Sequence, residues 1–181
     1  MNNEEIQKLI TVLKNGGIAV VRTDTLYGIV ARADDESAVE RVYEVKHRQP
    51  HKSCIVLVGS VDQAYGDVEE LAYDINEISD TPTSFLLESA TAPPWLLRQN
   101  SYLAHRLPSV EWLREVARAT GPLIAPSANP EGASPARTID EAKAYFGDRI
   151  DMYVDGGEVP IDTPASRLIR IEPDGTLTRL R

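Results

Sequence analysis

Residues 18–33, which read IAVVRTDTLYGIVARA, decide the fold. Two short apolar runs, at 18–21 and near 28–33, flank a polar segment of hydroxyl, carboxyl and phenol side chains. Apolar runs of this length predict buried strands. A polar break between buried strands costs free energy unless its groups are satisfied, so we interpret residues 22–28 as a binding loop. A structural alternative stays open, because threonine suits strands and Gly28 permits a bend.

Helical and strand patterns alternate outward from this stretch. They predict four helices. The first spans 4–14, and the second runs from an N-cap at Asp35 to about residue 45. The third runs from an N-cap at Ser109 to about 119, and the fourth from a capping box of Thr138 and Glu141 to 147. Residues 61–79 are expected to be helical in part. Further strands are expected at 53–58, 83–87, 102–106, 122–125, 150–154, 167–171 and, after a turn at 173–175, at the end of the sequence. The pattern predicts one α/β domain, 1–181, with a twisted mixed sheet and flanking helices.

Bulk composition narrows the class of protein. The 181 residues suit one domain with a sizeable core. Hydrophobic residues make up 42% and charged residues 26%, as in ordinary globular proteins, and no apolar run approaches the length of a membrane span. Because the first residues also lack a secretory signal, we expect a cytoplasmic protein without a membrane partner. Cys54, the single cysteine, lies in an apolar run and is expected to be a buried thiol.

The charge is unevenly distributed. A formal net charge of -9 argues against coating of nucleic acid, so any tRNA binding is expected to be weak. Residues 46–52 nevertheless carry two lysines, one arginine and two histidines without an acid. If Pro50 ends the helix early, Lys46 and Arg48 can converge on one anion, with arginine as a fork and lysine as a point charge. A solvated basic turn, or cations that complement a helix C-terminus, explains the composition equally well.

Two more polar segments follow predicted strands. Ser127 and Asn129, two residues apart, can both address one ligand, although an ordinary turn has the same composition. Arg106 ends a predicted strand as either an anion ligand or an edge residue whose stem packs on apolar surface. No metal-ligand spacing and no nucleophile with a base is recognisable. Cations and hydroxyls suit a reaction governed by positioning and charge neutralisation, such as phosphoryl or nucleotidyl transfer.

In order and spacing, these segments resemble the threonylcarbamoyl-AMP synthase (YrdC-like) family over residues 6–181. The matching segments are 22–28 (Pro-Thr-Asp-Thr-x-Tyr-Gly in the family), 46–48 (Lys-x-Arg), 82–84 (Pro-Gly-Pro-x-Thr), 106–108 (Arg-x-Pro), 127–132 (Ser-x-Asn, then Gly) and 155–157 (Asp-Gly-Gly). The resemblance implies a YrdC-like fold around a deep basic cavity. It also implies synthesis of threonylcarbamoyl-AMP and pyrophosphate from L-threonine, bicarbonate and ATP, with Mg²⁺ carried on the ATP. Partner proteins would then modify the adenosine beside the tRNA anticodon.

The resemblance also implies residue roles. Lys46 and Arg48 would be the catalytic cations. The nucleotide would contact Thr25, Lys52, Ser127, Asn129 and Ser166, and L-threonine would lie near Thr23, Tyr27 and Arg106. The chain departs from the family pattern at Arg22, Val30, Ser53 and 164–167, where a Ser-Thr pair is replaced and Ser166 is expected to supply the hydroxyl. Two alternatives remain: a related carbamoyl-adenylating enzyme like those of hydrogenase maturation, and a non-catalytic RNA-binding YrdC-like module.

Overall fold

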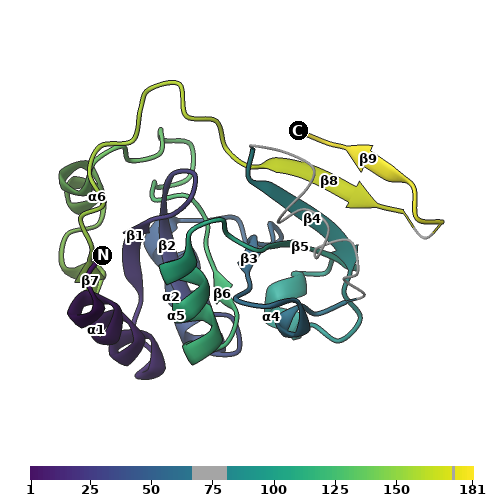
Figure 1. The fold of residues 1–181 in the computed structure, drawn as a ribbon, viewed down its shortest axis with the longest axis horizontal. Helices are drawn as coiled ribbons and strands as arrows, with labels where there is room; N and C mark the ends of the chain where they lie inside the picture. Colours follow the sequence, from purple (N-terminus) through teal and green to yellow (C-terminus); the bar gives the residue numbers. More distant parts are fainter. Residues whose placement is uncertain (67–80, 173) are drawn as a thin grey trace.

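In the computed structural model, which describes residues 1–66, 81–172 and 174–181, a mixed sheet runs through the molecule (Figure 1). Nine strands of the described part pair in the order β7-β1-β2-β6-β3-β5-β4-β8-β9. Their bounds are β1 Ala19–Arg22, β2 Tyr27–Arg32, β3 Val56–Leu57, β4 Thr83–Glu88, β5 Tyr102–Arg106, β6 Leu123–Ile124, β7 Met152–Tyr153, β8 Arg167–Ile171 and β9 Leu177–Arg179. The pairs β1–β7, β3–β5 and β4–β8 are parallel and the others antiparallel, which confirms the predicted mixed sheet.

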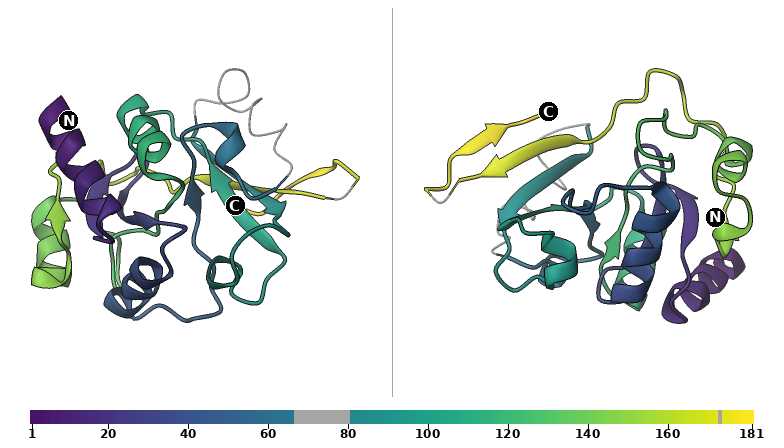
Figure 2. Two further views of the ribbon diagram at one scale, coloured as in Figure 1. Left: turned by 90° about the horizontal axis from the view of Figure 1, so that it is seen from below. Right: turned by 180° about the vertical axis from the view of Figure 1, so that it is seen from behind.

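Helices cover both faces of the half of the sheet that contains β1 and β2 (Figure 2, left). On one face lie α1 (Asn3–Lys14) and α5 (Glu111–Thr120), and on the other lie α2 (Glu36–Lys46), α4 (Pro94–Leu97) and α6 (Ile139–Phe146). The alternation of side chains along a strand explains this arrangement. Val20 of β1 packs with α2 and α6, whereas its neighbours Ala19 and Val21 pack with α1 and α5. β1 and β2 read as nearly continuous apolar runs because both of their faces are buried.

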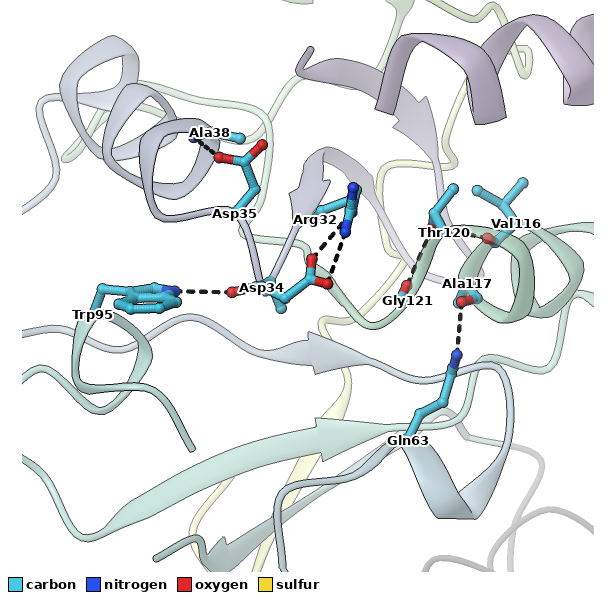
Figure 3. Close-up of polar contacts among 11 residues, drawn as sticks. Arg32, Asp34, Asp35, Ala38, Gln63, Trp95, Val116, Ala117, Thr120 and Gly121 are labelled. Atoms are coloured by element: carbon cyan, nitrogen blue, oxygen red, sulfur yellow. Dashed lines mark hydrogen bonds and ion pairs between the residues drawn. The ribbon is translucent and has the colours of Figure 1, made fainter. Parts of the chain in front are cut away.

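A polar network braces the connection from β2 to α2 (Figure 3). The side chain of Asp35 accepts a hydrogen bond from the backbone in the first turn of α2, as expected of an N-cap. Arg32 and Asp34 pair at 2.8 Å, and the Trp95 indole N–H donates to the carbonyl oxygen of Ala33 at 2.9 Å. This network fixes the start of α2, and the last turn of that helix then carries Lys46 towards the candidate site described below.

Several predicted element ends are wrong for identifiable reasons. Ser109 does not cap α5, because the first helical hydrogen bonds, from the N–H groups of Leu113 and Arg114, are accepted by the Val110 carbonyl; Val110 is therefore the N-cap, and it makes no side-chain bond. The capping box of α6 is half formed: Thr138 accepts from the backbone of Glu141, but the Glu141 carboxylate accepts from the backbone of Arg137. The helix ends at Gly147 as predicted.

The strand predicted at 53–58 is regular only at Val56–Leu57, although single backbone hydrogen bonds extend to Ile55 and Val58, and residues 53–55 line a cavity. Helix α4, four residues long, was not predicted. Of the segment 61–79, a 3-10 turn at Val61–Gln63 is described, and the prediction for 67–79 lies outside the described residues. Cys54 is buried as predicted. Within the described ranges, no helix combines the length and apolarity that a membrane crossing requires.

Candidate active site

A cavity of about 380 Å³ opens where the polar segments meet. Its lining comes from the loop between β1 and β2, the residues after α2, the end of β5, the segment 125–127 and the start and return of the β8–β9 hairpin. In the described part of the chain, the charged side chains of this lining are three arginines, Arg48, Arg106 and Arg181. Among the described residues, the lining contains no acid, and of the three guanidinium groups only Arg106 pairs with a carboxylate, that of Asp24 behind the wall. The cavity therefore has a positive potential, although the whole chain carries -9. Such a concave, cationic site suits an anionic ligand.

Backbone pairing brings two of the polar segments together. Gly28 forms a bridge with Ser127, the Ala128 N–H donates to the Tyr27 carbonyl at 2.7 Å, and the Ile29 N–H donates to the Pro126 carbonyl at 2.9 Å. Sequence reasoning placed both segments at strand ends but could not place them beside each other, because the antiparallel pairing of β2 with β6 is a long-range contact.

The loop between β1 and β2 is held by its own hydroxyls. Thr23 Oγ1 donates to the Leu26 carbonyl at 2.8 Å and accepts from the Thr25 backbone N–H at 3.2 Å. The two threonine hydroxyls lie 3.1 Å apart, and because Thr23 has already used its proton, Thr25 is the donor between them. Both threonines are buried and line the cavity, so the predicted binding loop faces it.

Tyr27 lines the cavity, and its hydroxyl bonds to the segment 155–157. That hydroxyl donates to the Gly157 carbonyl at 2.9 Å and accepts from the Gly156 N–H at 2.9 Å. Burial raises the pKa of the Tyr27 phenol, against a lowering by the bond from Gly156. A Cβ on Gly156 would lie 2.5 Å from the Cβ of Arg22, which explains the glycine. The Asp-Gly-Gly segment therefore anchors the tyrosine and does not line this cavity.

Lys46 and Arg48 diverge, because His47 between them adopts the left-handed conformation, with φ at 52°. The extended chain that would let both reach one anion is absent at this point. Arg48 lines the cavity, and its Nε and Nη2 donate to the carbonyls of Lys52 and Ser53 at 3.0 and 2.8 Å. These bonds fix the plane of the guanidinium at the cavity wall.

Lys46 is a buried structural cation in this arrangement. Its side chain is 2% exposed, and Nζ donates to the backbone carbonyls of Ser127 and Asn129. Burial is the largest cause of a lowered pKa, to about 8, and the Arg48 charge adds to it. Lys46 is outside the cavity lining, and it ties the end of α2 to the loop that presents Ser127.

Of three further residues predicted to contact the nucleotide, one lines the cavity and two support the loops around it. Ser127 lines the cavity and donates its hydroxyl to the Asn129 side-chain oxygen at 2.6 Å. Asn129 uses its amide to hold the backbone of its own loop, and Lys52 pairs with the carboxylate of Glu131. The hydrogen bond from Lys52 is the largest cause of the lowered pKa of Glu131. Sequence reasoning missed this pairing, because Glu131 lies far from the basic segment in the chain.

Arg106 ends β5 and forms a buried ion pair with Asp24 of the β1–β2 loop. Arg106 Nη2 lies 3.1 Å from Asp24 Oδ1, with side-chain exposures of only 6% and 1%. The other carboxylate oxygen accepts the Ser109 N–H at 3.2 Å. Burial lowers the pKa of Arg106, whereas the Asp24 charge opposes that effect. The edge-residue alternative for Arg106 is thus excluded, because the side chain is buried and faces the cavity.

Ser166 and Arg181 close the cavity at the β8–β9 hairpin. Ser166 is buried, and its hydroxyl lies 2.9 Å from that of Ser84. Arg181 Nε donates to the Ser166 carbonyl at 3.0 Å, and its Nη2 lies 3.4 Å from the Ser166 hydroxyl. Arg181 was not predicted as a site residue. The turn at 173–175 between two strands is the sequence signal that could have placed Arg181 beside Ser166. Across this hairpin, the Leu180 N–H donates to the Leu168 carbonyl at 2.8 Å.

Comparison with known proteins gives one family for this arrangement. The Sua5_yciO_yrdC family model, described as "Telomere recombination", matches residues 11–181. A threonylcarbamoyl-AMP synthase of Marinobacter nauticus is 32% identical, covering 78% of this chain and 78% of its own. One of Klebsiella pneumoniae is 32% identical, covering 86% of this chain and 88% of its own.

A solved structure of similar fold is that of P. abyssi Sua5 complexed with L-threonine, with a TM-score of 0.88 and 26% identity. The match covers 100% of this chain, which spans 54% of the length of that protein.

Proposed function

The chain belongs to the Sua5–YciO–YrdC family, and on that premise we propose that it condenses L-threonine, bicarbonate and ATP to threonylcarbamoyl-AMP and pyrophosphate. The main support for the proposal is the cavity, which is lined by residues of four of the six segments that resemble the family's motifs, 22–28, 46–48, 106–108 and 127–132, and by three arginines. The names of relatives about 30% identical support the same reaction.

In the proposed reaction, the amine of L-threonine attacks carbon dioxide derived from bicarbonate, forms a C–N bond and loses a proton to give a carbamate. One carbamate oxygen then attacks the α-phosphorus of ATP in line, and the bond from that phosphorus to the β-phosphate bridge breaks to release pyrophosphate. Both reactants are anions, so their approach requires opposing charge. Arginine donors in a partly enclosed site supply it more strongly than they would in water.

We assign Arg48 and Arg181 to the ATP phosphates and Arg106 to the carboxylate of L-threonine. Neither Arg48 nor Arg181 has a carboxylate partner among the described residues, so both are available to a polyanion. Thr23, Thr25, Ser127 and Ser166 supply hydroxyls, and Lys46, Lys52 and Asn129 act by shaping the loops. No group of three or more His, Cys, Asp and Glu residues gathers as a metal site in the described ranges, so Mg²⁺ would enter on the ATP phosphates.

The product is a mixed anhydride, which is reactive towards amines. We propose that partner proteins in the cytoplasm pass its threonylcarbamoyl group to the adenosine beside the anticodon of tRNA. The chain itself would supply the activated intermediate, because its cavity suits small anions and its overall negative charge disfavours a long nucleic acid.

A product analysis tests this function. Purified protein is incubated with ATP, Mg²⁺, L-threonine and ¹³C-bicarbonate, and the products are identified by mass spectrometry. We expect threonylcarbamoyl-AMP that carries one ¹³C atom, and pyrophosphate in equal amount. A parallel incubation with carbamoyl phosphate in place of threonine and bicarbonate addresses the alternative of a carbamoyl-adenylating enzyme. If an adenylate, carbamoyl-AMP, forms only in the second incubation, the substrate is carbamoyl phosphate and the proposed reaction is wrong. If no adenylate forms in either incubation, the protein does not catalyse an adenylation of this kind.

A further inference from the structure

The pair of Asp24 and Arg106 lies between two cavities. Arg106 lines the large cavity, whereas Asp24 lines a second cavity of about 350 Å³ that also contains Ser109, Trp112 and Gly156. Thr23 lines both, so the β1–β2 loop forms the wall between them. The two members of the pair come from elements far apart in the sheet order, β1–β2 and β5.

The guanidinium of Arg106 is only partly satisfied by the protein. Asp24 faces Nη2, but Nε is buried without a hydrogen-bond partner in the described structure. Buried donors without partners are costly, and in a cavity wall they indicate a place for a ligand acceptor. Asp24 is itself held, because its second oxygen accepts the Ser109 N–H just before α5. Its first oxygen makes no hydrogen bond among the described residues and faces Nη2 of Arg106 at 3.1 Å as an ion pair, so the held carboxylate fixes where the negative charge lies beside the guanidinium.

The Asp24–Arg106 pair also differs in net charge from the other cations of the cavity. Arg48 and Arg181 have no carboxylate partner in the described residues, so each carries one positive charge. Asp24 and Arg106 together carry no net charge. A neutral unit with a free donor suits the carboxylate of a zwitterionic amino acid. Unpaired arginines suit a polyphosphate, which carries several negative charges.

We propose that Asp24 is a positioning residue that orients Arg106 and neutralises it, so that this end of the cavity selects an amino-acid carboxylate over a phosphate. The inference rests on the proposed function for the identity of the amino acid. The end of the cavity at Arg106, which has an acidic partner, would bind the amino-acid carboxylate. The end at Arg48 and Arg181, which have none in the described residues, would bind the polyphosphate.

The test measures the affinities of two probes, L-threonine and inorganic pyrophosphate, by titration calorimetry at fixed ionic strength. In Asp24→Asn, the Kd of L-threonine should rise about tenfold to a hundredfold, because the donor of Arg106 is no longer held in place. The Kd of pyrophosphate should stay the same or fall, because the variant gains one net positive charge beside the cavity. Asp34→Asn is the matched control, since it removes a carboxylate paired with Arg32 at the surface and should change neither affinity.

The second cavity permits a rescue experiment. In Asp24→Ala, formate can reach the vacated carboxylate position through that cavity and should restore L-threonine affinity. Formate should have no such effect on Arg106→Ala. If Asp24→Asn and Asp24→Ala do not fold, Asp24→Glu keeps the charge but displaces it, and it should still weaken L-threonine binding.

Three outcomes in Asp24→Asn would overturn the inference. The first is unchanged affinity for both probes, and the second is an equal loss of both affinities. The third is a lower melting temperature with no change in L-threonine affinity, because that result would show a purely structural role for Asp24. If the wild-type protein binds no L-threonine, the proposed function fails separately. The ¹⁵N signal of Arg106 Nε then decides the positioning: a shift and faster exchange with water in Asp24→Asn support it, and an unchanged signal refutes it.

Discussion

Single residues in the cavity wall already have partners, which limits how a ligand can use them. Ser166 is 2% exposed and shares a hydrogen bond with Ser84, while Arg181 approaches it from the β9 side. Its neighbour Ala165 also lines the cavity but offers no polar group. The hydroxyl at this point therefore acts together with Arg181, and removing it affects both the buried Ser84 and the arginine.

Replacement of Ser166 by alanine should slow pyrophosphate release that depends on L-threonine and bicarbonate by roughly tenfold to a hundredfold, as expected for one hydrogen bond to a charged group. Ala165→Ser, which adds a hydroxyl to the same wall, should not slow the reaction. Ser89→Ala is the control, because Ser89 is equally buried but bonds the Leu87 carbonyl away from the cavity. Unchanged kinetics and an unchanged melting temperature in Ser166→Ala would remove this residue from the site.

At the same scale, the sequence predicted which residues lie at one cavity better than it predicted what they contact. Seven of the ten candidate residues line the cavity, the exceptions being Lys46, Lys52 and Asn129. Lys46 could not be placed, because its direction depends on the left-handed His47. The partner of Arg106 could not be predicted either, because the loop of Asp24 meets β5 only in the folded sheet.

At the scale of elements, β5 carries a buried histidine next to the arginine of the site. His105 is fully buried; its Nε2 accepts the Tyr65 N–H at 3.2 Å, and its Nδ1 then carries the proton towards the Leu103 carbonyl at 3.1 Å. Burial lowers the pKa of His105 to about 4, although the Leu103 carbonyl opposes this. The neutral imidazole is thus part of the packing of β5, and it does not face the cavity.

This pKa predicts a loss of stability in acid. The unfolded chain takes up the His105 proton near pH 6.5, but the folded chain does so only near pH 4, so the unfolded state binds more protons between these values. The stability that neutral His105 contributes is therefore present above pH 6.5 and is lost as the pH falls. Urea unfolding from pH 7 to 4 should show wild type losing about 3 kcal/mol more than His105→Gln.

A surface histidine provides the control for this measurement. His51 is exposed, and because His51→Gln leaves the buried imidazole of His105 in place, this variant should lose stability in acid as the wild type does. Parallel pH profiles for wild type and His105→Gln would show that the buried imidazole does not govern stability in acid.

Element types were predictable wherever periodicity was long, and their ends were not. The amphipathic spacing of α1 and the cap of α2 are local signals, and the structure confirms both. Ser109 had the right type for a cap, but the helix begins one residue later, with hydrogen bonds to the Val110 carbonyl. Short elements such as β3 and α4 depend on their neighbours more than on their own residues, so sequence patterns resolve them poorly.

At the scale of the whole molecule, the distribution of charge matters more than its sum. The chain carries a net charge of -9, yet the charged side chains lining the cavity in the described structure are three arginines. A negative exterior repels long nucleic acids, whereas a small anion that enters the cavity meets mainly positive charge. The mixed sheet makes this possible by bringing β2, β5 and β8 to the same cavity.

This distribution predicts that the protein binds bare tRNA weakly. Dissociation constants should be in the micromolar range or above at physiological salt, and the logarithm of affinity should fall with the logarithm of salt with a slope of only about -2 to -3, since few phosphates are contacted. Filter binding or fluorescence anisotropy across a salt series measures this slope. Tight binding that persists in high salt would favour an RNA-binding module over the enzyme.

The most direct test of the proposed reaction is the steady-state rate of pyrophosphate release with ATP, L-threonine and bicarbonate in wild type, Arg48→Ala and Lys8→Ala. Lys8 is an exposed cation on α1 that pairs with Glu4, so its variant should retain the wild-type rate. Arg48→Ala should keep the fold and lose about one to three orders of magnitude in rate, because a guanidinium is removed from the cavity wall. Wild-type turnover in Arg48→Ala would contradict the role of this arginine, and pyrophosphate release by the wild-type protein that does not depend on L-threonine would contradict the proposed reaction.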